Sequence, residues 1–263
     1  MLRPRIIPCL LLRNGGLVKT VSFNKPKYVG DPINAVKIFN EKEADELIVL
    51  DIDATVQGTQ PNLRLIAQFA AECRMPLCYG GGVKTVEQAR AITGLGVEKV
   101  AISSAALENP RLISAMAQEI GSQSIVVVLD VKKRLPAGAY EVWTHNGQKN
   151  SGKSPVQIAQ DAESCGAGEI VVNSIENDGQ MRGYDLELAE LIRKAVRLPL
   201  TVLGGAGSLA DIGRLIGTCG IVGAAAGSLF VFKGKYRAVL INYPSRSERD
   251  ALARPAETET GSS

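Results

Sequence analysis

The sequence of 263 residues contains few of the residue types that mark metal, redox or nucleic-acid sites. It has one histidine, His145, and its five cysteines show no CxxC spacing. Aromatic residues make up 5% of the chain, the net charge is +3, and no basic run is present. The sequence therefore predicts no metal site, no cofactor and no nucleic-acid partner.

Long apolar runs are also missing. No stretch of 18 apolar residues and no signal-like N-terminal segment occurs, so we expect no membrane segment and no secretion. The cysteines lie in apolar segments, as reduced thiols commonly do, which indicates a cytoplasmic protein. With 45% hydrophobic residues, the chain can build the core of one large domain.

What the sequence does contain is a glycine-rich motif that occurs twice. PLCYGGGVKTVE at 76–87 has its counterpart in PLTVLGGAGSLAD at 199–211, which begins 123 residues later. In each copy an apolar run ends in glycines that precede a helix start, an arrangement that suits a phosphate group. Tight turns, or close packing of strand against helix, are the alternative interpretation. Further matches near this offset pair 45–53 with 168–176 and 97–106 with 220–229, which indicates a duplicated half-domain.

Apolar segments alternate with helical patterns along the chain. Strands are predicted at Arg5–Leu12, Glu46–Asp51, 76–80, Lys99–Ser103, Ser124–Asp130, Glu169–Ser174, 199–204 and Ile221–Ala225. Helices are predicted between them, with the last one within Lys233–Asn242. This order predicts an α/β fold, a (β/α)8 TIM barrel with an internal half-barrel repeat, over residues 1–243. Residues 244–263 read as a disordered tail. An open doubly wound sheet is the alternative.

In such a barrel the loops that follow the strands form the active site. Two equivalent corners facing each other predict an elongated small-molecule substrate with a phosphate at each end. The residues expected at the first corner are Gly81, Gly82, Ser103 and Ser104. Those expected at the second corner are Gly204, Gly205, Gly227 and Ser228.

Four charged residues near these corners are further candidates. Asp130, at the end of a strand, is the candidate general acid or base, or else a helix cap. Lys19 lies in a long polar loop at 13–30, a possible lid, and is either a substrate clamp or solvated. Asp51 and Asp178 are expected to contact ligand or to hydrogen-bond within their own loops. His145, beside Asn146-Gly147, is expected to be a turn residue.

Four more charged residues open strands at the other end of the predicted barrel. If their side chains point inward, they form a ring of two cations and two anions at the barrel floor. Buried charges of this kind must be paired to offset their desolvation. The ring is either a structural plug of salt bridges or a polar gate. Its members are Arg5, Glu46, Lys99 and Glu169.

The motifs together resemble the cyclase subunit of imidazole glycerol phosphate synthase, almost end to end as far as Phe232. The motifs that carry the resemblance are RIIPCL, DELIVLDI, GGGVKT, EKVAISSAA, GSQSIVVVLD, GAGEIVVNSIENDGQMRGYD and GGAGSL. The resemblance implies a barrel that binds a bisphosphorylated substrate and docks a glutaminase on its bottom face. Ammonia would pass a charged gate, matched here by all four ring residues, and meet the general acid/base at Asp130 beneath the lid lysine, Lys19.

The sequence departs from this family at the catalytic centre. The family's second catalytic Asp, on the first strand, is replaced by Leu11, which cannot transfer a proton. The family's Asn on strand 4 is Ser103 here, and its Thr on strand 6 is Asn173. This pattern resembles a branch associated with amidino-sugar synthesis for lipopolysaccharide O-antigen, in which an ATP-dependent sugar amidotransferase is a further partner. The authentic cyclase, which forms imidazole glycerol phosphate, and a non-catalytic ammonia conduit remain alternatives.

Overall fold

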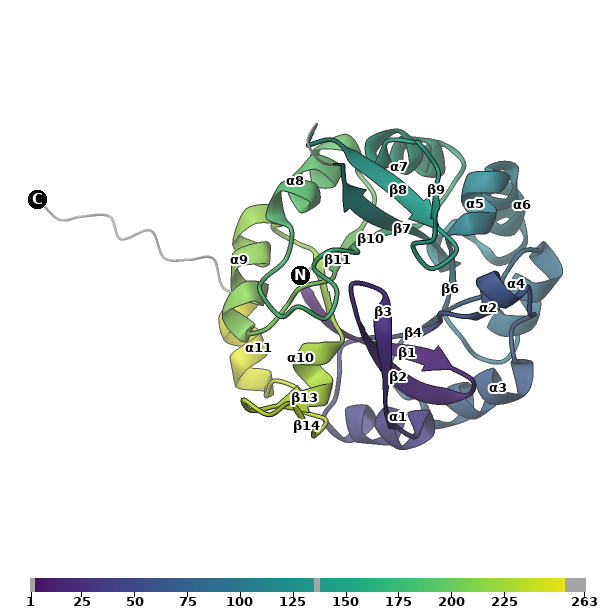
Figure 1. Cartoon of the computed structure of the whole chain (residues 1–263). Helices are drawn as coiled ribbons and strands as arrows, with labels where there is room; N and C mark the ends of the chain where they lie inside the picture. The colour runs from purple at the N-terminus through teal and green to yellow at the C-terminus, as the bar shows by residue number, and fades with distance from the viewer. Residues whose placement is uncertain (1–2, 135–137, 254–263) are drawn as a thin grey trace, which may run out of the picture.

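The computed structural model describes residues 3–134 and 138–253, which form a closed barrel of parallel strands (Figure 1). Each strand pairs with its neighbour in the order of the chain, and pairing of β10 with β7 completes the ring. The eight barrel strands are β1 (Arg5–Arg13), β4 (Leu47–Asp51), β5 (Leu77–Gly80), β6 (Lys99–Ile102), β7 (Ile125–Lys133), β10 (Glu169–Ser174), β11 (Leu200–Leu203) and β12 (Gly223–Ala226). The predicted (β/α)8 barrel is confirmed, and the open sheet is excluded because the ring closes.

Helices cover the outside of the barrel (Figure 1). The longer ones are α1 (Pro32–Glu41), α3 (Leu63–Glu72), α4 (Val86–Thr93), α6 (Arg111–Ile120), α7 (Pro155–Ser164), α8 (Leu186–Ala195) and α9 (Leu209–Cys219). Three short helices lie in the loops that follow strands, namely α2 (Ala54–Gln57), α5 (Ser104–Glu108) and α10 (Ser228–Val231). The sequence patterns did not predict these three, because a helix of four or five residues is too short to show helical periodicity.

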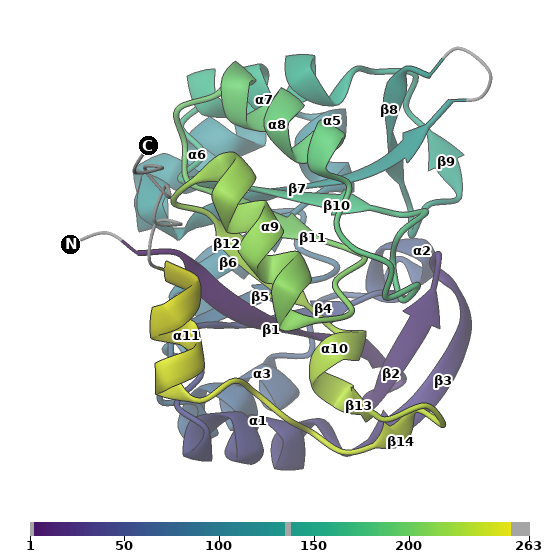
Figure 2. The ribbon, with the colours of Figure 1, turned by 90° about the vertical axis from the view of Figure 1, so that its left-hand side faces the viewer.

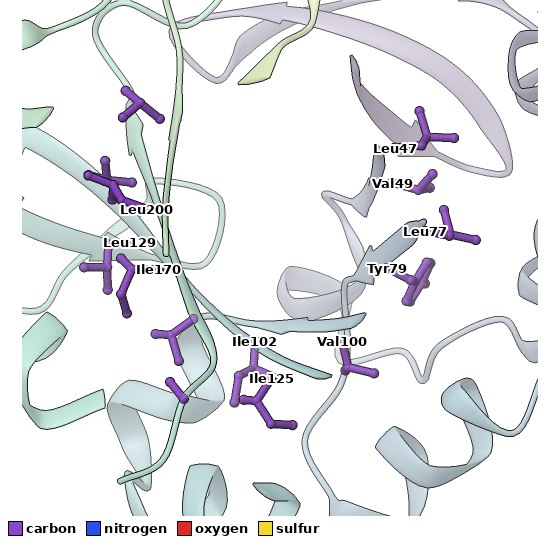
Figure 3. Packing of buried hydrophobic residues seen from close by; sticks show 14 of the residues in the cluster. Leu47, Val49, Leu77, Tyr79, Val100, Ile102, Ile125, Leu129, Ile170 and Leu200 are labelled. Atoms are coloured by element: carbon purple, nitrogen blue, oxygen red, sulfur yellow. The ribbon is translucent and has the colours of Figure 1, made fainter. Parts of the chain in front are cut away.

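Side chains of each barrel strand alternate between two apolar clusters. Outward residues such as Leu47, Leu77 and Val100 pack between the strands and the helices (Figure 3). Inward residues fill the barrel itself. In β1, for example, Ile7 and Cys9 belong to the inner cluster, whereas Ile6 and Leu10 belong to the outer one. This two-residue period means that one sequence position decides whether a side chain faces the helices or the barrel interior.

The two halves of the barrel repeat the same helix start. Thr85 and Gln88 form a capping box at the start of α4, and Ser208 and Asp211 form one at the start of α9. Reciprocal bonds of this kind satisfy backbone N–H groups that have no partner within the helix. Both boxes follow the glycine-rich motifs found in the sequence, so the half-barrel repeat extends to the hydrogen bonding of the helix termini.

Two β-hairpins extend from the mouth end of the barrel (Figure 2). One joins β2 (Gly16–Val21) to β3 (Asn24–Gly30), and the other joins β8 (Tyr140–Thr144) to β9 (Lys149–Asn150). The turn of the second contains His145, which confirms the turn expected beside Asn146-Gly147. The first replaces the irregular lid loop predicted at 13–30: β2 pairs with the end of β1, so this segment is an ordered extension of the barrel sheet.

The C-terminal segment differs from the prediction in two places. Instead of a helix within Lys233–Asn242, the structure has a short hairpin of β13 (Phe232–Lys233) and β14 (Ala238–Val239), with Gly234 at a φ of 72° that a helix does not contain. The disordered tail predicted from residue 244 is wrong over α11 (Arg246–Ala253). The remainder of that predicted tail, 254–263, lies outside the described residues.

Helix α11 is held against the barrel by Arg249. This side chain is 7% exposed, donates a hydrogen bond of 2.8 Å to the carbonyl oxygen of Glu43, and stacks on the ring of Tyr243. Tyr243 in turn donates to the carbonyl of Ile6 at 2.7 Å. The helix therefore packs on the end of the barrel opposite the two hairpins (Figure 2). The polar sequence of α11 did not predict this packing, because a single buried arginine attaches the helix to the barrel.

Candidate active site at the barrel mouth

A cavity at the carboxyl ends of the strands brings together many of the predicted site residues. It is lined by Lys19, Asp51, Gly81, Gly82, Ser103, Ser104, Asp130, Asp178, Gly227 and Ser228. The residues come from seven different strand ends or loops, as expected of the active-site face of this fold. Leu11 and His145 line the same cavity.

Asp130 has the properties of a proton-transfer group. Burial raises its pKa to about 7, and the nearby Asp178 adds to this increase, whereas a hydrogen bond from Asn173 opposes it. The Asn173 bond runs from Nδ2 to Oδ1 of Asp130 and is 3.0 Å long. A carboxyl group that titrates near neutral pH can both give and accept a proton under ordinary conditions. Asp130 therefore combines a place in the cavity lining with a pKa that suits the predicted general acid or base.

Leu11 faces the cavity from β1 and gives it an apolar wall. It belongs to the inward row of that strand, after Ile7 and Cys9, and packs against the inner apolar cluster. Its side chain has no hydrogen-bonding atoms. The apolar lining of the barrel therefore continues on this strand up to the mouth, where the resemblance leads one to expect a second carboxylate.

Lys19 is buried in the mouth, which argues against the solvated alternative. It projects from β2, is 5% exposed, and donates a hydrogen bond of 2.6 Å from Nζ to the carbonyl oxygen of Cys9. Burial lowers its pKa, and the neighbouring Cys9 and Asp178 oppose this. A Cβ on Gly227 would overlap Lys19 Nζ, so this glycine makes the space for the lysine.

Asp178 and Asp51 both bond within the protein while lining the cavity. Asp178 accepts a hydrogen bond of 2.7 Å from Thr20 Oγ1, which ties the loop after β10 to the β2–β3 hairpin. Asp51 accepts from the backbone N–H groups of Asp53 and Ala54, each at 3.2 Å, and so holds the start of α2. Burial raises the pKa of both carboxyl groups. Their loop-bonding role is thus visible in the structure, and contact with a ligand stays a prediction.

The two glycine corners differ in how open they are. At the first corner all four predicted residues line the cavity, whereas at the second corner Gly227 and Ser228 do so and Gly204 and Gly205 are not among the described lining residues. Gly205 is covered by the loop after β10, because its carbonyl oxygen accepts a hydrogen bond of 2.9 Å from Gly183 N. The sequence repeat predicted two equal corners. The chain folds over part of the second.

At the opposite end of the barrel, the four charged residues form the predicted ring. Arg5 bonds to Glu46 and, at 2.7 Å, to Glu169, while Lys99 bonds to the same two carboxylates at 2.7 and 2.8 Å. Thr201 adds a hydrogen bond of 2.6 Å to Glu169. Burial alone would raise the pKa of Glu169, but the charges of Arg5 and Lys99 outweigh it and hold the pKa below the ordinary value. In the ring, two basic side chains and two carboxyl groups thus bond to one another in alternation.

Between the ring and the mouth the barrel interior is apolar. Strand β10 shows the sequence of layers, since its inward residues are Glu169 in the ring, Val171 in the inner cluster, and Asn173 at the mouth. The inner cluster consists of Ile7, Cys9, Ile48, Cys78, Ala101, Val126, Val128, Val171, Leu203 and Ala225, with Leu11 and Leu50 packed against it. Burial raises the pKa of the Cys78 thiol well above its ordinary value, so this side chain is neutral.

Several residues of the mouth were not assigned a site role from the sequence, and three of them are informative. Asn173 was noted only as a departure from a family pattern, His145 as a turn residue, and Phe23 not at all; all three line the cavity. Every second side chain of β10 points inward, so the positions of Glu169 and Val171 could have predicted that Asn173 faces the cavity. No local pattern reveals Phe23 or His145, because each reaches the cavity from the tip of a hairpin that folds back over the barrel.

Among residues 3–134 and 138–253, no group of three or more His, Cys, Asp or Glu side chains is placed to hold a metal ion. In the same part of the chain, no helix has the length and apolar character needed to cross a bilayer.

The fold and site define a (β/α)8 barrel with a polar cavity at the mouth and a charged ring at the base. Comparison with known proteins identifies the family: a model described as "Histidine biosynthesis protein" matches residues 5–237, and the chain belongs to this family. The relatives reported below are named as subunits of imidazole glycerol phosphate synthase.

Three of these relatives show the range of similarity. A protein of Leptospira interrogans named "Putative imidazole glycerol phosphate synthase subunit HisF" is 58% identical over 96% of this chain and 99% of its own length. One of Vibrio vulnificus, named likewise but as "hisF3", is 59% identical over 95% of this chain and 96% of its own. The "Imidazole glycerol phosphate synthase subunit HisF" of Lactococcus lactis subsp. lactis is 41% identical over 81% of this chain and 82% of its own.

Proposed function

We propose that this chain is the ammonia-accepting synthase subunit of a two-protein glutamine amidotransferase. A glutaminase partner docks at the ring end of the barrel, and ammonia passes through the interior to a phosphorylated acceptor in the mouth. The observation that carries the proposal is the order of layers along the barrel axis, with the Arg5–Glu46–Lys99–Glu169 ring at the base, apolar side chains in the interior, and Asp130 at the mouth. Ammonia is small and neutral, so an apolar interior does not impose on it the desolvation cost of an ion.

The family reaction, formation of imidazole glycerol phosphate in histidine biosynthesis, is the chemistry that the relatives' names support best. In this chain Asp130 would transfer protons during ring closure, since its raised pKa keeps it near the balance point at neutral pH. The first corner, with Gly82 and Ser104, would bind one phosphate end of the substrate. Gly227 and Ser228, beside Lys19, would bind the other.

A second candidate function rests on Leu11. Where acid and base roles are divided between two carboxylates, loss of one typically costs about 10² to 10⁴ in rate. An apolar residue at this place favours a changed ammonia acceptor. The candidate acceptor is an amidino sugar precursor for lipopolysaccharide O-antigen, modified by an ATP-dependent sugar amidotransferase. In a further alternative, the barrel catalyses no reaction and only conducts ammonia from the glutaminase to a second partner.

The deciding experiment uses the purified chain without partners. It is given the bisphosphorylated substrate of the family and excess ammonium at alkaline pH, and substrate loss is followed. Turnover comparable with that of an ordinary family member supports the histidine-pathway reaction. Absence of turnover in the wild type, together with turnover in Leu11→Asp, supports the changed acceptor. Asp130→Asn is the control, because it must abolish any turnover that depends on this carboxyl group.

Passage through the ring is tested separately with the glutaminase and glutamine present. Lys99→Ala removes one cation of the ring, and we expect it to reduce glutamine-dependent transfer more than transfer from free ammonium that enters at the mouth. If Lys99→Ala lowered the glutamine-dependent rate and the ammonium-dependent rate by the same factor relative to the wild type, passage through the ring would be contradicted.

A further inference from the structure

The turn between β8 and β9 brings the only histidine of the chain into the mouth. His145 lines the same cavity as Gly82, Ser103 and Ser104 of the first corner. The hairpin that carries it extends from β7, so its turn lies at the rim of the barrel rather than on the outer surface (Figure 1). Nothing in the cyclase-type reaction as described above uses this side chain.

His145 is attached directly to the first corner. Its backbone N–H donates a hydrogen bond of 3.3 Å to Ser104 Oγ, and its φ is 53°, a left-handed conformation uncommon for a residue other than glycine. The hydroxyl of Ser104 accepts this bond, so its own hydrogen remains available to a ligand. This contact holds the backbone of His145 beside the corner.

One ring nitrogen of His145 has a hydrogen-bonding partner in its own hairpin. Nδ1 of His145 lies 3.0 Å from Thr144 Oγ1, a hydroxyl that can alternatively donate to the carbonyl of Lys149 at 3.4 Å. The Thr144 hydroxyl is therefore placed to donate to Nδ1. A neutral imidazole whose Nδ1 accepts carries its hydrogen on Nε2, which is then a donor.

The polar groups around the corner suit an anion. The hydroxyl oxygen of Ser103 is buried and has no hydrogen-bond partner among the described residues. Lys84, two residues beyond Gly82, lines the same cavity and adds a positive charge. The carboxylates of Asp51 and Glu108 line the cavity as well, and Asp51 is already bonded to the backbone of α2. A buried donor without a partner is costly, and a ligand oxygen would satisfy it.

We propose that His145 is a ligand for the phosphate group bound at the first corner, with Nε2–H donating to a phosphate oxygen beside the Ser104 hydroxyl. This inference rests on the proposed function, which supplies a phosphorylated ligand. It assigns to the β8–β9 turn a direct part in substrate binding. It also explains how a corner in which serine replaces a longer amide side chain keeps enough donors for a phosphate.

The test uses the fact that one histidine gives one set of ring signals in NMR spectra. Inorganic phosphate is titrated into the tag-free protein at constant ionic strength, with chloride as the reference. We expect the His145 ring signals and the amide signals of Gly82 and Ser104 to shift with one common dissociation constant. His145→Asn, which keeps the left-handed backbone readily, is expected to weaken phosphate binding about tenfold or more, because hydrogen bonds to charged groups are strong. Lys149→Gln, on the exposed part of the same hairpin, is the matched control and is expected to bind as the wild type does.

The outcomes separate this inference from the function on which it rests. If the Gly82 and Ser104 signals shift while the His145 ring does not, or if His145→Asn binds phosphate as tightly as the wild type, the role of His145 is disproved and the phosphate corner stands. If phosphate shifts neither set of signals, the corner itself fails and the inference fails with it. Unchanged thermal midpoints of the variants show that any loss of binding is local.

Discussion

The side-chain amide of Asn173 donates to the carboxyl group of Asp130 across neighbouring strands, at an N–O distance of 3.0 Å. Asn173 is 4% exposed, and its own Oδ1 is buried without a partner among the described residues. The pair therefore presents a carboxyl group and a free amide oxygen at the end of the apolar interior. The hydrogen bond orients Asp130 and limits how far burial raises its pKa.

This environment predicts an unusual pH dependence of stability. The pKa of Asp130 is raised to about 7 in the folded protein. Between about pH 4 and 7, the folded state therefore keeps a proton on Asp130, whereas the unfolded state has lost it. Its contribution to stability is therefore present at low pH and is lost as the pH rises through 7. Asp130→Asn keeps a side-chain oxygen that can accept the hydrogen bond from Asn173. Because the amide does not titrate, the variant does not lose stability as the pH rises. We expect the variant to be more stable than the wild type at pH 8, by on the order of 1 to 4 kcal/mol, with the difference shrinking toward pH 4.

Urea unfolding at a series of pH values measures this difference. The control is Asp250→Asn, which changes an exposed carboxyl group and is expected to alter the free energy of unfolding little at any pH. Asp185→Asn would not serve, because Asp185 caps a helix. A constant stability difference between Asp130→Asn and the wild type from pH 4 to 8 would contradict the raised pKa.

The ring at the base predicts strong coupling between its members. Glu169 is 4% exposed and contacts Arg5, Lys99 and Thr201, so Glu169→Gln leaves two cations with one carboxylate. We expect it to lower the free energy of unfolding by about 3 kcal/mol. The double variant Lys99→Met/Glu169→Gln leaves one cation and one anion, and is expected to lose less than the sum of the two single variants. Denaturant unfolding in a double-mutant cycle measures this coupling, and additive losses would mean that the ring is not a unit.

The two hairpins meet above the mouth at Gly147 and Phe23. A Cβ on Gly147 would lie 3.1 Å from Phe23 Cδ2, and the φ of Gly147 is 70°. Gly147→Ala therefore combines backbone strain with a crowded contact, and we expect a loss of more than about 1 kcal/mol in stability. Gly152→Ala is the matched control, since Gly152 has a φ of 67° in the same extension and its Cβ would meet no atom within 4 Å. Thermal unfolding of both variants separates strain from contact; equal losses would mean that Phe23 does not constrain the turn.

Helix α11 depends on Arg249 for its attachment. Arg249→Met removes the hydrogen bond to Glu43 and the stacking on Tyr243, and we expect the free energy of unfolding to fall by about 2 kcal/mol. Arg246→Met changes an exposed arginine of the same helix and is expected to alter stability by less than about 0.5 kcal/mol. Limited proteolysis gives a second readout, because a detached α11 is cut near its start. Equal stability of the two variants would contradict the anchoring role.

The sequence predicted the barrel well because its strands are short, apolar and bounded by glycine, proline or charge. The residues of the base ring were also predictable, since each opens a strand and the two-residue period fixes which way it points. The β2–β3 hairpin was missed because its second strand, NKPKYVG, is exposed and polar, without apolar alternation. Burial of Lys19 and attachment of His145 to Ser104 depend on segments far apart in the sequence, so no local pattern could reveal them.

The interior between the base ring and the mouth has a consequence for selectivity that does not depend on the partner. From Glu169 to Asn173 the strand rises about 13 Å, and the side chains of the inner cluster over this distance carry no formal charge within the described residues. An ion that entered would leave its hydration shell with no counter-charge to replace it, at a cost of many kcal/mol. A small neutral solute would lose little. If ammonia passes through the interior, as proposed above, such a lining would discriminate by solvation energy and favour the uncharged form of this weak base over the ammonium ion.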